Sequence, residues 1–232
     1  IVPSEAVKRD VLEHLGVPED RVAVTLHGCE ARFRPEMDEA SLRAVRAKYA
    51  LPQRYVLAVG NLEPRKNLSM LLQAFARLRQ SAEVDPELRL VLAGGRGWLE
   101  QPIFQTAKSL GLENFVIFPG FIDDDDLPDV YRGAAVFVFP SLYEGFGLPL
   151  IEAMACGVPV ISSNTSCMPE VAGGAALLVD PVDTDQMAAA IARVLHDQAL
   201  RDRLRQQGIA RAGQFSWDAS ARQTLDLYAS LV

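Results

Sequence analysis

The chain has 232 residues, of which 49% are hydrophobic and 23% charged, and its formal net charge is −7. This composition is typical of a globular protein with a sizeable core, and the acidic balance argues against a nucleic-acid partner and a generally basic membrane face. No stretch approaches about 18 uninterrupted apolar residues, so the sequence predicts no membrane span. The three cysteines lack metal-ligand spacing, which predicts reduced thiols and a cytoplasmic location.

The first 54 residues predict little regular structure. A helix is expected over residues 4–16 and a strand over residues 22–28, followed by a polar connector around residues 28–38. The abrupt start, directly in a strand-like fragment, suggests a chain cut out of something longer.

From residue 55 onward, short apolar runs alternate with amphipathic segments. The runs predict strands at 55–61, 88–95, 115–121, 134–141, 158–164 and 175–180. Helices are predicted at 67–81, 103–111, 126–134, 148–157, 184–197, 199–212 and 216–232, with Asn67 as the N-cap of the first. Such alternation predicts an α/β fold with a Rossmann-like, doubly wound parallel sheet, in which ligands bind beyond the carboxyl ends of the strands.

The segment GNLEPRKN, residues 60–67, follows the first of these strands. Gly60 ends the strand, and Arg65 and Lys66 come just before a helix. A diphosphate placed there would meet backbone N–H groups, the positive end of the helix dipole and two cations. The alternative interpretation is that Arg65 and Lys66 are ordinary solvated charges.

The segment YEGFGLPLIEAMACG, residues 143–157, holds two glutamates at either end of an apolar run. Glu144 lies in the predicted loop and Glu152 in the first turn of the predicted helix, so both can face one cleft. Two carboxylates can accept hydrogen bonds from neighbouring sugar hydroxyls, which favours a polyhydroxyl ligand. Alternatively, Glu152 merely complements the helix dipole.

Together the two segments describe a nucleotide-sugar site, and here the sequence resembles a known family. It is similar to the retaining glycosyltransferases of the GT-B fold, family four, which include many bacterial mannosyl- and glucosyltransferases. The resemblance rests on the E-x7-E element from Glu144 to Glu152, and on VGNLEPRKN, LAGG, FPGFI and VFVFPS in the family's order. It is strong over residues 55–232 and weak over residues 1–54.

The resemblance implies a role for each matching position. Arg65 and Lys66 would bind the donor diphosphate, and Glu144 with Arg65 and Lys66 would form the catalytic set. The sugar and distal phosphate would lie against Glu144 and the backbone of Gly145, Phe146, Gly147 and Leu148. Glu152 would take the ribose hydroxyls. The remaining donor-binding positions are Gly60, Asn61, Gly94, Phe121 and Ile122, of which the last two would lie along the base.

The resemblance also implies substrates and chemistry. The donor would be GDP-mannose, with UDP-glucose and ADP-glucose as alternatives, because several family members with an EPRKN segment are mannosyltransferases. The acceptor would be a sugar or a lipid-linked glycan. No cofactor and no metal ion are expected, since cations and helix dipoles stabilise the leaving diphosphate in this family.

The domain organisation follows from the same resemblance. Residues 1–20 would be a remnant of the N-terminal acceptor domain, residues 21–54 an edge strand and connector, residues 55–215 the donor-binding domain and residues 216–232 a C-terminal helix. The fragment alone would then be inactive. Any peripheral contact with the cytoplasmic face of the inner membrane would be made by the missing N-terminal domain.

Two departures and several alternatives stay open. Many family members carry arginine where this chain has Asn61, and the hinge reads HGCE at residues 27–30. The DDDD run at 123–126 is expected to cap the following helix rather than bind a metal. A phosphorylase or an epimerase would be another enzyme of this fold. A non-catalytic nucleotide-sugar-binding module or regulatory subunit is the alternative from a different class.

Overall fold

The computed structural model describes residues 1–81, 84–95 and 101–231. Within these residues a six-stranded sheet has the order β3-β2-β1-β4-β5-β6, and every neighbouring pair is parallel. The strands are β1 (Tyr55–Val59), β2 (Arg89–Ala93), β3 (Val116–Gly120), β4 (Val136–Phe139), β5 (Val160–Ser163) and β6 (Leu177–Val179). The predicted α/β class and parallel sheet are therefore confirmed.

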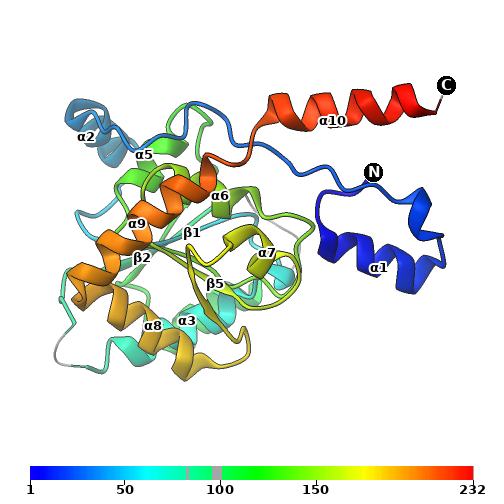
Figure 1. The fold of residues 1–232 in the computed structure, drawn as a ribbon. Coiled ribbons are helices and arrows are strands. Elements are labelled where there is room, and N and C mark those ends of the chain that lie inside the picture. The colour runs from blue at the N-terminus through cyan, green and yellow to red at the C-terminus, as the bar shows by residue number, and fades with distance from the viewer. Residues whose placement is uncertain (82–83, 96–100, 232) are drawn as a thin grey trace.

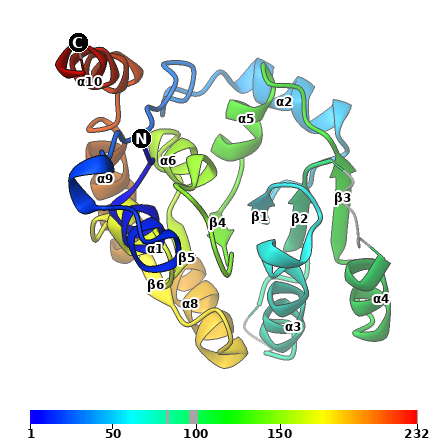
Figure 2. The ribbon, with the colours of Figure 1, turned by 90° about the vertical axis from the view of Figure 1, so that its right-hand side faces the viewer.

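Helices cover both faces of the sheet, as Figures 1 and 2 show. Val56 and Leu57 are adjacent in β1, and both are fully buried, but they pack into two separate clusters on opposite faces. The Val56 cluster includes residues of α3 (Leu68–Leu78), α4 (Gln101–Ser109) and α8 (Thr184–His196). The Leu57 cluster includes residues of α5 (Leu127–Arg132), α6 (Leu148–Ala155) and α7 (Met168–Ala172). Burial on both faces explains why these strands are continuous apolar runs.

The remaining elements lie around this core. The helices are α1 (Glu5–Leu15), α2 (Glu39–Lys48), α9 (Gln198–Ala212) and α10 (Trp217–Ser230), with short 3₁₀ turns η1 (Glu19–Arg21) and η2 (Pro64–Lys66). Helix α10 has no buried residue and extends away from the body of the molecule (Figure 1). None of the helices in the described ranges has the length and apolarity needed to cross a membrane.

The strand predicted at residues 22–28 is wrong. Val24 forms only an isolated bridge with Val2, through hydrogen bonds from Val2 N–H to the Ala23 carbonyl and from Thr25 N–H to the Val2 carbonyl, each 2.9 Å. A strand needs a row of partner residues, and this bridge supplies a single one. The edge strand assigned to residues 21–54 therefore does not join the sheet.

The polar stretch before β1 contains a helix that was not predicted. Helix α2 has only two buried residues, Leu42 and Val45, which are spaced by three positions, and it packs on α5. Asp38 caps its N-terminus by accepting a hydrogen bond of 3.0 Å from Ala40 N–H. So few apolar residues give a weak periodic signal.

Asn67 and Asp126 stand at the N-cap positions of α3 and α5, as predicted, but neither side chain makes a cap hydrogen bond. Asn67 has a left-handed φ of 56°, and its amide donates to the carbonyls of Pro140 (3.2 Å) and Pro181 (2.7 Å) instead of the side chain capping the helix. Asp126 makes no cap hydrogen bond, because its carboxylate binds Lys48 Nζ at 2.6 Å and the Tyr49 hydroxyl at 2.8 Å. Tertiary partners have replaced the local ones.

The sheet order sets the position of the site. Strand β1 pairs with β2 on one side and with β4 on the other, so the chain changes direction across the sheet between β1 and β4. In a doubly wound sheet, ligands bind at this point beyond the carboxyl ends of the strands. The loops that follow β1 to β5 meet there.

Candidate nucleotide-sugar site

Two glycines bring the loops after β1 and β2 into contact. Gly60 has a φ of 145° and Gly94 a φ of 151°. A Cβ atom added to Gly94 would lie 2.1 Å from the carbonyl oxygen of Gly60, so no larger residue fits there. Both glycines line a cavity at the strand ends.

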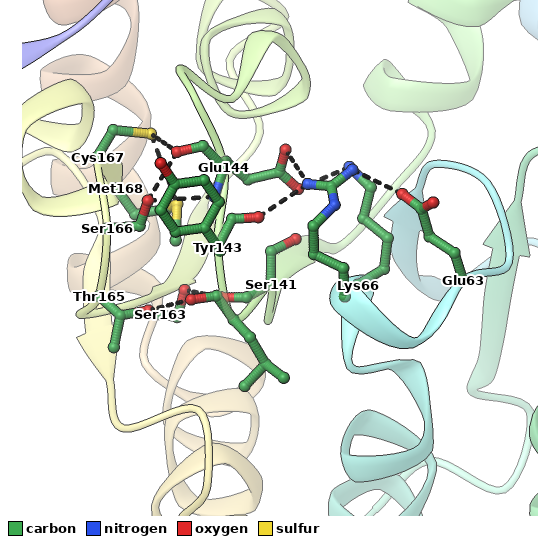
Figure 3. A network of polar contacts seen from close by, with 12 residues as sticks. Glu63, Lys66, Ser141, Tyr143, Glu144, Ser163, Thr165, Ser166, Cys167 and Met168 are labelled. Carbon is green, nitrogen blue, oxygen red and sulfur yellow. Dashed lines mark hydrogen bonds and ion pairs between the residues drawn. The ribbon is translucent and has the colours of Figure 1, made fainter. Parts of the chain in front are cut away.

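The turn after β1 presents its cations to Glu144. Lys66 Nζ lies 2.8 Å from Glu144 Oε1, and Arg65 Nη1 lies 2.6 Å from Glu144 Oε2. Arg65 also donates to the Tyr143 carbonyl at 2.8 Å and pairs with Glu63 at 2.6 Å. Figure 3 shows this network at the meeting point of two loops. The structure thus brings together the three residues predicted as the catalytic set.

The electrostatics of Glu144 follow from these contacts. Its side chain is almost buried, with 8% of the residue exposed. Burial alone would raise the pKa of Glu144, but the charge of Lys66 and the hydrogen bonds from Lys66 and Arg65 outweigh it, so the pKa lies below its ordinary value. The carboxylate is therefore ionised and firmly held.

The loop from Gly145 to Leu148 offers backbone donors. Among the described residues, none accepts a hydrogen bond from the N–H groups of Gly145, Phe146, Gly147 or Leu148. Gly147 has a φ of 90° and directly precedes α6, so the positive end of the helix dipole adds to these donors. The Phe146 side chain is 3% exposed and packs edge-on against Phe215, so only its backbone can serve a ligand.

Glu152 occupies a different environment from Glu144. Helix α6 begins at Leu148, as predicted, but Glu152 is its fifth residue and so lies in the second turn instead of the predicted first turn. The Tyr131 hydroxyl donates to its carboxylate at 2.8 Å. Burial raises the pKa of Glu152 above its ordinary value, and the hydrogen bond from Tyr131 and the charge of Arg32 offset this only in part. That both carboxylates reach one ligand stays a prediction.

A cavity of about 150 Å³ lies beside these residues, at the carboxyl ends of β1, β2 and β3. Phe121 and Ile122 line it on one side; Phe121 is 67% exposed, whereas Ile122 is buried. Its full lining is Val59, Gly60, Asn61, Ala93, Gly94, Gly95, Phe121, Ile122, Asp124 and Leu127. Five of the predicted donor-binding residues therefore line one cavity.

Sequence reasoning missed several polar partners at the site. Tyr131 is fully buried in a helix that looked amphipathic, and nothing in its neighbourhood signals that its hydroxyl meets Glu152. Ser166 binds the backbone of Glu144, and its position in a Ser- and Thr-rich loop after β5 was the only available signal. Asp124 lines the cavity, whereas the acidic run to which it belongs was expected mainly to cap a helix.

The acidic run and the N-terminal helix have structural partners. Lys48 Nζ pairs with Asp123 at 2.8 Å and with Asp126 at 2.6 Å. In the described ranges, no group of three or more His, Cys, Asp or Glu side chains is arranged to hold a metal ion. Helix α1 is tied to the site loop, since Tyr143 donates to Asp10 at 2.7 Å and Ser4 donates to the Gly145 carbonyl at 2.7 Å.

Comparison with known proteins decides the family. The family model of the glycosyl transferases group 1 matches residues 43–211. The chain belongs to this family. Its sheet is that of the GT-B glycosyltransferases: the sucrose-phosphate synthase of Thermosynechococcus elongatus has a TM-score of 0.83 at 30% identity, over 99% of this chain and 57% of that chain.

The chain is also similar in sequence to two curated relatives. It is 38% identical to the O-antigen chain mannosyltransferase B of Escherichia coli, over 97% of this chain and 58% of the relative. It is 35% identical to the mannosylfructose-phosphate synthase of Agrobacterium fabrum, over 98% of this chain and 52% of the relative. The chain thus spans about half the length of these relatives.

Proposed function

We propose that this chain is the donor-binding half of a retaining, metal-independent hexosyltransferase. It would transfer mannose from GDP-mannose to an acceptor sugar or a lipid-linked glycan in the cytoplasm. The observation that carries the proposal is the contact of Lys66 and Arg65 with Glu144, next to N–H groups at the start of α6 that have no acceptor among the described residues. The names of the two curated relatives support mannose as the sugar.

The diphosphate would compete with Glu144 for the same cations. A phosphate oxygen binds guanidinium and ammonium groups as strongly as a carboxylate does, and a diphosphate carries more charge. Donor binding would therefore draw Arg65 and Lys66 towards the phosphates and free the Glu144 carboxylate. The freed carboxylate can accept hydrogen bonds from two hydroxyls of the sugar.

The leaving group would be stabilised by the protein's own positive charge. In this proposal, Arg65, Lys66 and the N–H groups of Gly145 and Phe146 would surround the diphosphate as it gains charge during cleavage of its bond to the sugar; the contacts of both cations with Glu144 support this. Fixed donors of this kind stabilise a developing charge without reorganising. Retention of the anomeric configuration is carried over from the family resemblance.

The cavity beside the strand ends favours guanine as the base. Phe121 and Ile122 offer apolar surface to a flat ring, and among the described residues Asp124 is the single ionisable one in its lining. The edge of guanine presents N1–H and N2–H₂ as two adjacent donors, which a carboxylate can accept together. Uracil presents one such donor and adenine offers no matching pair, so Asp124 would discriminate between the donors.

Calorimetric titration without divalent metal tests the proposal. The chain is titrated with GDP, GDP-mannose, UDP, UDP-glucose and ADP-glucose, and we expect the guanine nucleotides to bind most tightly. The double substitution Arg65→Ala/Lys66→Ala should weaken GDP at least about a hundredfold, because two charge-assisted contacts are lost. A matched control, Lys108→Ala/Arg203→Ala, removes two exposed positive charges elsewhere and should leave the affinity unchanged.

A further pair of variants separates the base from the diphosphate. Asp124→Asn should weaken GDP about tenfold and leave UDP unaffected, whereas Asp125→Asn should change neither, because Asp125 lines a different cavity. Equal affinity for all nucleotides would refute the guanine assignment. No binding of any nucleotide would refute the donor-site proposal.

A further inference from the structure

The segment that ends β5 runs beside the loop that carries Glu144. Five of its side chains donate to four carbonyls between the end of β4 and Glu144, as Figure 3 shows in part. The donors are Ser162 to Phe139 (3.3 Å), Ser163 to Ser141 (2.6 Å), Thr165 to Leu142 (3.1 Å), Ser166 to Glu144 (2.7 Å) and Cys167 to Glu144 (3.1 Å). We call these five residues the donor row.

Ser166 differs from the other members of the donor row. Its hydroxyl donates to the Glu144 carbonyl at 2.7 Å and also accepts from the Glu144 N–H at 3.2 Å. Its backbone has a φ of 54°, which is uncommon for a residue with a side chain and costs roughly 1 kcal/mol or more. Strain of this kind persists where the surroundings hold it, and it gathers at functional positions.

One hydroxyl that binds both the N–H and the C=O of a residue fixes the peptide planes on either side of it. The Cα–Cβ direction of Glu144 is then set by Ser166, and Cys167 adds a second bond to the same carbonyl. This direction points the Glu144 carboxylate at Lys66 (2.8 Å) and Arg65 (2.6 Å).

We infer that Ser166 is a positioning residue, which holds the backbone of Glu144 so that its carboxylate meets the donor sugar in one fixed geometry. The role of Glu144 towards the sugar rests on the proposed function, but the hold of Ser166 on Glu144 does not. Small errors in the placement of a reacting group lower the reaction rate strongly, because a shift of about 1 Å can lower it about a hundredfold.

Two variants separate this role from general support of the loop. Ser166→Gly removes the hydroxyl but suits a positive φ, so the variant should fold at least as well as the parent. Thr165→Ala is the matched control, because it removes the neighbouring hydroxyl, whose bond goes to Leu142 instead of Glu144.

Hydrogen exchange measures directly how firmly Ser166 holds the backbone of Glu144. The amide of Glu144 should exchange faster in Ser166→Gly, seen in a peptide covering residues 143–147, and stay as in the parent in Thr165→Ala. With GDP-mannose and the full-length protein, kcat of Ser166→Gly should fall about ten- to a hundredfold while the Kd of GDP changes less than about twofold.

Each outcome either supports or overturns the proposed role of Ser166. Faster exchange with the kcat loss supports the inference. Unchanged exchange in Ser166→Gly, equal effects of both variants, or full kcat overturns it. If the parent protein neither binds GDP nor transfers sugar, the proposed function has failed, and the exchange comparison still decides whether Ser166 holds Glu144.

Discussion

The two glutamates of the site differ in how they meet solvent and charge. Glu144 lies against two cations, and its pKa lies below its ordinary value because their attraction outweighs the effect of burial. Glu152 has Tyr131 as its hydrogen-bond partner, and burial raises its pKa. The fold therefore stabilises the ionised form of Glu144, whereas ionised Glu152 lowers the stability of the fold.

Glu152→Gln should make the protein more stable and a weaker binder. A carboxyl group with a raised pKa stabilises the fold at low pH, and this contribution is lost as the pH rises through the raised value. The glutamine stays neutral, so the variant should have the higher melting temperature at pH 7 and a flatter stability profile above pH 4.5, the ordinary value of the group. Thermal unfolding between acid and neutral pH measures this.

The same variant tests the ribose contact. Losing a charge-assisted hydrogen bond of about 1.5–3 kcal/mol should weaken GDP roughly ten- to a hundredfold. Glu144→Gln serves as the comparison, since it should lower the melting temperature at pH 7: its carboxylate contributes stability above pH 4.5 that is lost as the pH falls. A Glu152→Gln variant that binds GDP like the parent would exclude Glu152 as the ribose partner.

At the scale of elements, Asn67 joins the start of α3 to two other loops. Its amide binds the carbonyls of Pro140 after β4 and Pro181 after β6. Asn67→Ala loses both hydrogen bonds and keeps an unfavourable left-handed φ, so it should destabilise the chain by about 2–3 kcal/mol. Urea unfolding measures the free energy.

Asn67→Gly separates the two contributions. Glycine tolerates the left-handed conformation, so this variant should lose about 1 kcal/mol less than the alanine variant. Equal losses in the two variants would mean that the backbone conformation contributes nothing and that the two hydrogen bonds carry the whole effect.

The strands of the sheet could be predicted because burial on both faces leaves an unmistakable apolar run, as in β1 and β4. Helix α2 could not, since Leu42 and Val45 are its only buried residues and give too weak a period. The strand expected at 22–28 failed because strand formation depends on a partner, and the sequence does not say that only Val2 lies beside Val24.

The site, too, has residues that could be predicted from the sequence and residues that could not. Arg65, Lys66 and Glu144 could be found because glycines and charges cluster at strand ends, and the structure brings them together. The role of Ser166 could not, because its contact joins two loops 22 residues apart that meet only after β5 has paired with β4. What the site binds stays a prediction.

At the scale of the whole molecule, α10 contributes little to the core. It has no buried residue, and Leu225 and Tyr228 are 64% and 56% exposed. Removing residues 219–232, which leaves the stacking of Trp217 on His27 intact, should change the free energy of unfolding by less than about 1 kcal/mol. Chemical denaturation of the shortened chain measures it.

Leu204→Ala is the control for that experiment. Leu204 lies in α9 and is 2% exposed, so its truncation should cost about 2–5 kcal/mol. A loss of similar size on removing α10 would contradict the structure, since it would require α10 to pack against the body.

The strand order bears on the order in which the binding site is assembled. Every described residue that lines the 150 Å³ cavity lies between residues 59 and 127, on β1, β2, the loops after β1, β2 and β3, and the first residue of α5. Glu144 and Glu152 come later in the chain, and Val56 of β1 must pair with Val136 of β4, 80 positions on, before either can face Lys66. During synthesis from the N-terminus, the surface proposed for the base can therefore form while the residues proposed for the sugar are still being made. The proposed site is thus assembled only when β4 pairs with β1.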